Sequence, residues 1–488
     1  MLAATVGGSS IAFLDSTVVN VALPHIGEDL DAGMGGLQWV LTGYLLAVSS
    51  LILLGGSLGD RFGRKKVFQL GVVVFALASL LCAVAPTVQL LVAGRVVQGV
   101  GGALLTPGSL AILEASFRPS ERARAIGAWS GLSGVASAIG PFVGGWLVDA
   151  ASWRWIFLIN LPLSLFVVLV AARHVPESLD PDAARHIDVV GALLVAAGLA
   201  GLSWGLIAAD DGWGSPSVWG PLLLGAVAMV LFVVDTRRSP DPMVPPAIFA
   251  SAQFRAANLV TAAVYAALGG TFFLLVIQLQ TVLGYSAIEA GAATLPITLL
   301  MLALSARSGA LAARIGPRLQ MTAGPLLVAL GTLLMTRIGA GDSYVTTVLP
   351  AVLVMGAGLA TVVAPLTATA LAAVDDRHAG VASGVNTTVA RAAQLAAVAA
   401  LPVAAGITGD AFLDPVASSD GFRTAMFITA GLAALGAVIA AVGIRNPEQV
   451  PEVEPAAEPA RFFCGAEGTP LHTCPGSTAG QSPSEHAA

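Results

Sequence analysis

Polar loops divide this chain into fourteen apolar segments, each long enough to cross a lipid bilayer as a helix. A helix needs about 20 mostly apolar residues to span the hydrocarbon core. Helix is also the required conformation there, because lipid offers no hydrogen-bond partners to an open backbone. The predicted spans are 2–24, 36–58, 67–86, 88–113, 123–149, 154–173, 187–208, 216–234, 256–283, 289–312, 317–339, 344–373, 379–406 and 422–444. We therefore predict an all-α polytopic membrane protein with fourteen transmembrane helices.

The composition agrees with lipid as the main solvent of this chain. Only 11% of its 488 residues are charged, and its mean hydropathy is +0.84, whereas a soluble domain carries about 25% charged residues. A net charge of -6 without an extended basic surface argues against a nucleic-acid partner. The first segment has no basic flank and carries Asp15, so we expect it to be a retained helix rather than a signal peptide.

Charged residues alternate between two sets of loops. One set is basic and holds Arg61, Arg64, Lys65, Lys66, Arg118, Arg122, Arg124, Arg173, Arg185, Arg237, Arg238, Arg255, Arg314 and Arg318. The other set is acidic and holds Glu28, Asp29, Asp31, Asp210, Asp211, Glu289, Asp342, Asp410, Asp414 and Asp420. Because basic loops stay on the cytoplasmic side, we predict a multi-pass protein of the plasma (inner) membrane with both termini in the cytoplasm.

A short internal repeat divides the chain into domains. Residues Gly56 to Lys65 (GSLGDRFGRK) resemble residues Gly309 to Arg318 (GALAARIGPR), and each copy follows a predicted helix. Parallel repeats of this kind are typical of secondary transporters that rock two halves around a central site. We predict two six-helix bundles and, between them, two additional helices, with domain ranges 1–175, 183–236 and 252–445.

The last stretch, 446–488, is rich in Pro, Glu, Ala, Gly and Ser and is predicted to be a disordered cytoplasmic tail. Its Cys464, His472 and Cys474 match no usual zinc spacing, so we predict no metal site. The chain contains no G-x-x-x-x-G-K-[ST] phosphate loop and no H-E-x-x-H zinc motif, which argues against an ATP-driven pump and an intramembrane enzyme.

Several signatures follow one another along the chain. They are Leu14 to Pro24, Gly56 to Lys66, Arg95 to Ala103, Gly134 to Gly145, Ser152 to Pro162 and Gly384 to Arg391. In this order they resemble the major facilitator superfamily, specifically its fourteen-helix drug:proton antiporters. The resemblance implies the major facilitator fold and a proton-coupled antiporter that exports small amphipathic compounds. It also implies the proton gradient as energy source, with no cofactor, and we expect a monomer.

Asp15 is the principal candidate for proton coupling. It lies near the middle of the first span, where an ionised carboxylate costs about 2.5–3.5 kcal/mol. Such a group is neutral when protonated and negative when empty, so it can hold either a proton or a cationic substrate. That mutual exclusion is sufficient for antiport. The alternative is a structural carboxylate paired with a neighbouring helix.

Arg95 shares a helix face with Gln98 in the fourth span. A guanidinium keeps its proton, so its role would be electrostatic. A pair with a nearby acid is worth about 4 kcal/mol at roughly 4 Å and an effective dielectric near 20. The alternative is an arginine that fixes two helices through exposed carbonyls. We add Asn20, Gln278 and Arg391 as further candidates for proton coupling or substrate contact, although Arg391 is equally consistent with a structural role.

Two further sets of candidates follow from the resemblance. A cytoplasmic gate would comprise Gly56, Asp60, Arg61, Gly63 and Arg64. The second copy of the repeat has Ala313 in place of Asp60, which predicts an asymmetric gate. A small-residue stripe for close helix packing and hinge motion would comprise Gly134, Gly140, Pro141, Gly144 and Gly145.

The resemblance also implies that members of the family that expel divalent cations carry a second embedded acid near the tenth span, and residues 291–306 contain none. We therefore predict neutral or singly charged amphipathic substrates, such as antibiotics, dyes and quaternary ammonium compounds. Two rival functions remain open on the sequence. One is a proton-coupled uptake symporter of the same fold, and the other is a transporter of lipids or metabolites that are not drugs.

Overall fold

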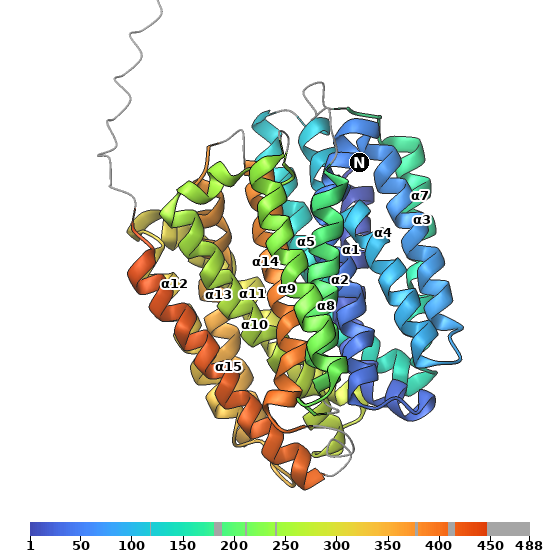
Figure 1. Ribbon diagram of the computed structural model, residues 1–488, viewed down its shortest axis with the longest axis vertical. Coiled ribbons are helices and arrows are strands. Elements are labelled where there is room, and N and C mark those ends of the chain that lie inside the picture. Colours follow the sequence, from blue (N-terminus) through green and yellow to red (C-terminus); the bar gives the residue numbers. More distant parts are fainter. Residues whose placement is uncertain are drawn as a thin grey trace, which may run out of the picture. The chain divides into compact units, whose positions relative to one another are not determined.

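The computed structural model describes residues 1–117, 119–179, 188–209, 212–239, 242–375, 379–407 and 415–446, and within these ranges it is helical with no strand (Figure 1). Fourteen of the described helical segments are long and apolar enough to cross a membrane, which confirms the predicted number of spans. The predicted tail with Cys464, His472 and Cys474, and the loop residue Arg118, lie outside the described residues.

The helices have the following bounds. The first half contains α1 (Leu2–Leu30), α2 (Met34–Phe62), α3 (Arg64–Ala83), α4 (Val88–Ser116), α5 (Pro119–Ala150), α6 (Trp155–Leu158) and α7 (Asn160–His174). Two middle helices are α8 (Val189–Ala208) and α9 (Pro216–Arg238). The second half contains η2 (Pro246–Ala250), α10 (Ala252–Thr281), α11 (Ala287–Ile315), α12 (Arg318–Met335), η3 (Tyr344–Val348), α13 (Leu349–Ala372), α14 (Ala379–Ala404) and α15 (Pro415–Gly443). The sixth predicted span is interrupted at Ile159 and forms α6 and α7.

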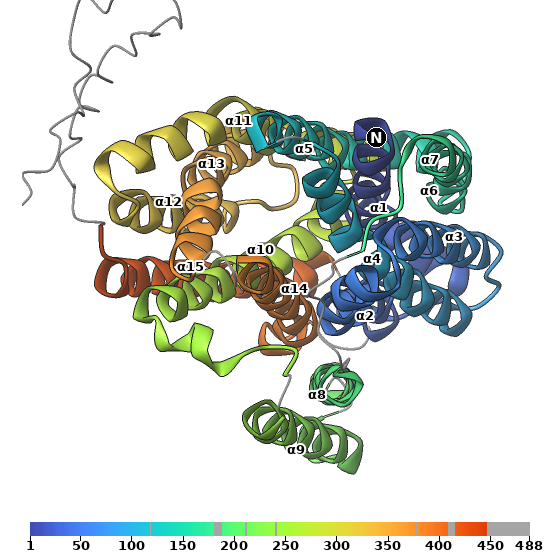
Figure 2. The same ribbon diagram turned by 90° about the horizontal axis from the view of Figure 1, so that it is seen from above.

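The helices of each half pack mainly against one another, and α8 and α9 form a separate pair. This pair lies outside the two halves, where α8 contacts α2 and α14 (Figure 2). The halves meet along two seams, one between α5 and α11 and the other between α2 and α14. The loops fall at two opposite ends because successive spans alternate in direction. We call the end with Arg61, Lys65 and Arg318 the basic face and the end with Asp29 and Asp149 the acidic face.

The internal repeat is visible in the backbone at the basic face. Gly63 ends α2 with a φ of 112°, and Gly316 ends α11 with a φ of 86°. Two residues later, the Lys65 N–H donates to Oε1 of Glu177 over 3.0 Å, and the Arg318 N–H donates to Oδ1 of Asn446 over 3.0 Å.

The side chains of the same two basic residues repeat a second contact. Nζ of Lys65 donates to the carbonyl of Ala172 over 3.0 Å, and Nε of Arg318 donates to the carbonyl of Ala441 over 2.9 Å. Both carbonyls lie five residues before the residue, Glu177 or Asn446, that accepts the backbone bond. The turn between α2 and α3 is therefore bonded to the end of α7, and the turn between α11 and α12 is bonded in the same way to the end of α15.

These turns require glycine, and alanine substitutions test that requirement. A non-glycine residue in such a backbone region costs about 1–3 kcal/mol, and a Cβ at Gly63 or Gly316 would also meet the side chain of Glu177 or Asn446. We expect Gly63→Ala and Gly316→Ala each to lower the melting temperature in detergent, measured by thermal unfolding. The control is Gly431→Ala, where a Cβ has nothing within 4 Å. Wild-type melting of both turn variants would contradict this interpretation.

Candidate functional site

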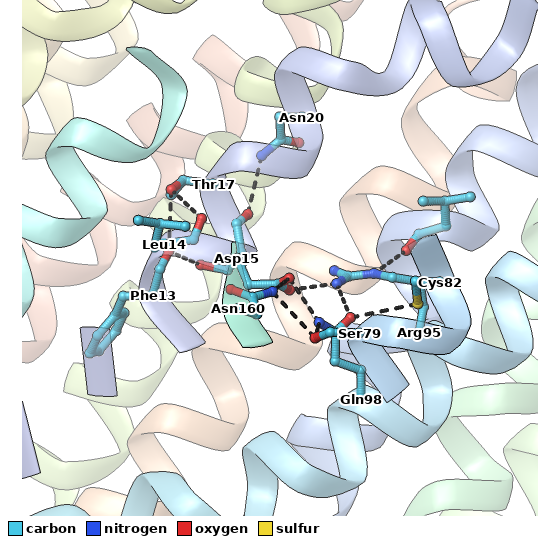
Figure 3. Close-up of polar contacts among 12 residues, drawn as sticks. Phe13, Leu14, Asp15, Thr17, Asn20, Ser79, Cys82, Arg95, Gln98 and Asn160 are labelled. Carbon is cyan, nitrogen blue, oxygen red and sulfur yellow. Dashed lines mark hydrogen bonds and ion pairs between the residues drawn. The ribbon is translucent and has the colours of Figure 1, made fainter. Parts of the chain in front are cut away.

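The carboxylate of Asp15 is fully buried at the centre of the first half. Nη1 of Arg95 donates to its Oδ2 over 2.5 Å, and Nε2 of Gln98 donates to its Oδ1 over 2.9 Å. Nδ2 of Asn160 donates to the same Oδ1 over 3.0 Å. The three donors converge on the carboxylate from two other helices, α4 and α7 (Figure 3).

Further bonds connect the donors to one another. Nη1 of Arg95 also donates to Oε1 of Gln98 over 2.6 Å. The hydroxyl of Ser79 on α3 accepts from Nε2 of Gln98 over 2.8 Å and from Nδ2 of Asn160 over 3.3 Å. We call Asp15, Ser79, Arg95, Gln98 and Asn160 the carboxylate cluster. All five side chains are buried, so water contributes little to the solvation of its charges.

Small residues bring the helices of the cluster close together. A Cβ at Gly94 of α4 would meet Cys82 of α3, and a Cβ at Gly99 would meet the backbone of Tyr44 in α2. Arg95 and Gln98 lie one turn apart on α4, so both reach the same carboxylate. Close backbone approach is what holds membrane helices together, because lipid supplies no hydrophobic drive between them.

Arg95 also connects the cluster to α2. Its Nε donates to the carbonyl of Val40 over 3.1 Å, and its guanidinium carbon lies 4.5 Å from the ring centroid of Tyr44. A cation over an aromatic face is attracted by the ring quadrupole. The single arginine therefore makes an ion pair with α1, a hydrogen bond with α2 and a cation–π contact with α2.

This geometry changes one expectation about Asp15. The sequence suggested that a cationic substrate and a proton compete directly for this carboxylate. In the structure Asp15 has 0% exposed surface, and both of its oxygens accept hydrogen bonds. A bulky cation cannot reach it in this arrangement, whereas a proton can be accommodated if the Arg95 contact breaks.

The other predicted coupling residues lie apart from the cluster. Asn20 donates to the Ser16 carbonyl of its own helix over 3.3 Å and points away from Asp15 (Figure 3). Gln278 is buried in the second half, where its Nε2 donates to the Ile338 carbonyl over 3.2 Å. Arg391 is a half-buried residue in the middle of α14.

Sequence reasoning assigned no role to two members of the cluster. Asn160 lies within a recognised signature, at the point where α7 begins after the break at Ile159. A polar amide within an apolar span is costly unless it is paired, so Asn160 could have been predicted as a site residue from the sequence. Ser79 gave no such signal, because serines are common in apolar spans and most bond to their own helix.

The predicted gate residues stay within the first half at the basic face. Nε of Arg64 donates to Oδ1 of Asp60 over 2.8 Å, one helical turn away. Arg61 is exposed and lies over the ring of Phe62 at 5.6 Å. A Cβ at Gly56 would make only ordinary van der Waals contact with Pro107 of α4. Asp60 thus pairs with a residue of its own half in this structure.

The small-residue stripe of α5 contacts two different helices near the acidic face. A Cβ at Gly140 or Gly144 would clash with Thr17 or Val18 of α1. A Cβ at Gly145 would clash with the backbone of α11 at Ala287 and Ile288.

The contact between α5 and α11 continues on both sides of Gly145. The Pro141 carbonyl leaves no room for a Cβ at Gly291. The Asp149 carboxylate accepts from the backbone N–H groups of Ala287 over 3.1 Å and of Ile288 over 2.8 Å. The first turn of α11 is therefore held against the last turn of α5.

The same seam separates toward the basic face. Gly134 lies eleven residues before Gly145, on the same side of α5, and a Cβ there would have nothing within 4 Å. Gly309 lies eighteen residues after Gly291 on the same side of α11, and a Cβ there would approach only Ala364 of its own half. The two helices are therefore in contact at the acidic face and diverge toward the basic face.

The other seam stays in contact over a longer distance. Nε2 of Gln38 on α2 donates to the carbonyls of Val398 and Ala399 on α14, over 2.8 and 3.1 Å. Nearer the basic face, Leu53 of α2 fills the space beside Gly384 of α14.

An apolar cavity of about 490 Å³ lies on the outer side of this second seam, between α2, α8, α9, α14 and η2. Its walls include Leu53, Leu199, Phe232, Val244 and Val389. It shares no residue with the carboxylate cluster. Among the residues that the structure describes, no group of three His, Cys, Asp or Glu side chains could hold a metal ion.

Fourteen apolar spans, twelve of them in two repeated halves and two in a separate pair, with a buried ion pair in one half, define a polytopic membrane protein of the secondary-transporter class. The chain belongs to the Major Facilitator Superfamily, whose family model matches residues 5–398.

Similar proteins include several resistance proteins. The puromycin resistance protein of Streptomyces alboniger is 35% identical over 88% of this chain and 88% of its own length. The tetracenomycin C resistance and export protein of Streptomyces glaucescens is 34% identical over 86% of this chain and 78% of its own length. The multidrug resistance protein Stp of Mycobacterium tuberculosis (strain CDC 1551 / Oshkosh) is 35% identical over 79% of this chain and 71% of its own length.

Solved structures share the fold at low sequence identity. An auto-inhibited peptide transporter of the POT family has a TM-score of 0.68 at 16% identity, over 92% of this chain and 98% of that one. The xylose transporter XylE from E. coli, in an inward-open conformation, has a TM-score of 0.61 at 14% identity, over 92% of this chain and 96% of that one.

Removing one partner of the buried ion pair tests its contribution to stability. Asp15→Asn leaves Arg95 buried without a counter-charge, which costs about 3–5 kcal/mol. We expect a clear fall in melting temperature, measured by thermal unfolding in detergent.

A second substitution, Arg95→Gln on the Asp15→Asn background, should restore much of this loss because it removes the unpaired charge. The control is Asp29→Asn, which breaks a surface pair with Arg154 whose side chains are 47% and 35% exposed. Such a pair is worth at most about 1 kcal/mol. An Asp15→Asn variant as stable as Asp29→Asn would contradict the assignment of the ion pair as a stabilising contact.

Proposed function

We propose that this protein exports small amphipathic molecules across the plasma membrane in exchange for protons, with Asp15 as the proton-binding group. The observation that carries the proposal is the burial of Asp15 with Arg95 at the centre of the first half. The relatives support the export of small molecules, because their names describe antibiotic and multidrug resistance.

The proton acts through Arg95 in this scheme. Protonation removes the negative charge of Asp15 and weakens the pair, so the guanidinium is held only by Gln98, the Val40 carbonyl and the Tyr44 ring. Two of these contacts are with α2, which forms one seam between the halves. A change of charge at Asp15 is thereby transmitted to the seam without contact between proton and substrate. The proton gradient supplies the energy, and no cofactor takes part.

The separated α5–α11 seam supports a rocking mechanism. With the basic face in the cytoplasm, as the distribution of charges predicts, the arrangement in the structure is an inward-facing state. Substrate would enter between the halves from the cytoplasm. Closure at the basic face would bring Gly134 and Gly309 together, and the contacts of Gly145 with α11 would open on the opposite side.

Transport in everted membrane vesicles tests the proposal. Vesicles from an efflux-deficient host that expresses the protein should accumulate an amphipathic dye when their interior is acidified. A protonophore should abolish the accumulation. We expect Asp15→Asn to retain dye exchange down a dye gradient and to lose all response to the proton gradient, because it keeps a polar side chain that cannot ionise.

Asp29→Asn is the matched control, since it removes an acid of the same helix that lies at the surface. It should accumulate dye like the wild type. Accumulation that persists with the protonophore, or full coupling in Asp15→Asn, would rule out the scheme. Proton-driven movement of dye in the opposite direction would instead indicate an uptake symporter.

A further inference from the structure

Arg391 lies on the side of α14 that faces α2. Gly384 packs against Leu53 of α2, and the Val398 carbonyl accepts from Gln38 of α2. Arg391 is seven residues, or about two turns, from each of these two positions. The three residues therefore form one stripe, and Arg391 is its midpoint.

The residue opposite Arg391 follows from the pairing of the two helices. Helices α2 and α14 run in opposite directions, with Leu53 beside Gly384 and Gln38 beside Val398. The midpoint between Gln38 and Leu53 falls at residues 45–46, next to Tyr44. Tyr44 of α2 and Tyr265 of α10 both lie within electrostatic reach of the Arg391 guanidinium. Arg391 is thus located between the two halves, in the middle of the membrane.

Among the residues that the structure describes, none pairs its charge with that of Arg391. It makes no hydrogen bond or ion pair with any residue in the described part of the chain. Asp15 is already neutralised by Arg95, with which it forms an ion pair of 2.5 Å.

The described acids of the second half are too distant along the helices to neutralise Arg391. They lie at helix ends or in loops, at Glu289, Asp342, Asp375 and Asp420. Within the described part of the chain, Arg391 is therefore a half-buried positive charge near the middle of its span without an acidic partner. Such a charge is costly in a membrane unless a ligand pairs with it.

We infer that Arg391 binds the acidic group of the substrate, and that this protein selects amphipathic organic anions, such as carboxylates or phenolates on an apolar ring system. A guanidinium suits this role because its planar fork matches a carboxylate. The half-buried ring of Tyr265 on α10 offers apolar contact to the remainder of such a molecule, whereas Tyr44 is fully buried beneath Arg95. The inference rests on the proposed function, and it narrows the expected substrates from neutral or singly charged amphipaths to anions.

Equilibrium binding to the purified full chain in a non-ionic detergent tests the inference separately from transport. The probes are fluorescein and rhodamine 123, an anionic and a cationic dye with the same ring system, measured by fluorescence anisotropy. We expect the wild type to bind fluorescein more tightly. Arg391→Gln should weaken fluorescein binding roughly tenfold to a hundredfold, as for the loss of a charged hydrogen bond, and should leave rhodamine 123 binding unchanged.

Two further variants separate charge from folding. Arg391→Lys keeps the charge and should retain much of the fluorescein affinity, while Arg391→Glu should reverse the preference between the dyes. The control is Arg307→Gln, which removes an exposed arginine of α11 and should bind both dyes like the wild type. Equal or tighter binding of rhodamine 123 by the wild type, or unchanged fluorescein binding in Arg391→Gln, would overturn the inference. Dye transport without proton dependence in the vesicle assay would refute the proposed function, but it would leave the inference about Arg391 standing.

Discussion

The ion pair between Asp15 and Arg95 is the constraint on which the first half of the structure depends. An ionised side chain in the middle of a membrane span is costly, and an unpaired one is more so. Satisfying the carboxylate requires donors from α4 and α7, and these donors share Ser79 on α3. Four helices must therefore meet at one point. The glycines of α4 permit this, because larger residues would keep α2 and α3 too far away.

The same pair explains how a proton can act on the contact between the halves. Arg95 is the only member of the carboxylate cluster whose side chain also bonds to α2. Its contact with the Tyr44 ring lies on the side of α2 that packs against α3 and α4, and α2 itself contacts α14 along the second seam. The Tyr44 ring lies against the guanidinium of Arg95, and Arg391 on α14 is also within electrostatic reach of it. In the proposed scheme, the proton binds at Asp15 and the substrate at Arg391, so the two do not compete for one carboxylate.

Small residues give the two ends of the molecule different properties. At the acidic face, Gly145 and Gly291 interlock with backbone atoms of the opposite half, and Asp149 holds the first turn of α11. Toward the basic face, Gly134 on the same side of α5 meets nothing. A contact made of backbone and small side chains can separate without leaving large cavities, so it suits a surface that opens and closes. The repeated turns at Gly63 and Gly316 each connect to the chain that follows the last helix of their own half.

The sequence by itself determined the fourteen spans, the repeated turn and the choice of Asp15, Arg95 and Gln98 as candidate site residues. These follow from hydropathy, from a motif with a glycine at a fixed place, and from the high cost of charge in lipid. Only the tertiary structure decided which side chains meet. Asn160 and Ser79 join the cluster, and Asn20 and Gln278 do not. Arg391 lies on the side of α14 that faces α2, without an ion pair to any described residue. The reason is that membrane helices are apolar on most sides, so their periodicity does not fix the rotation and tilt that bring polar groups of different helices together.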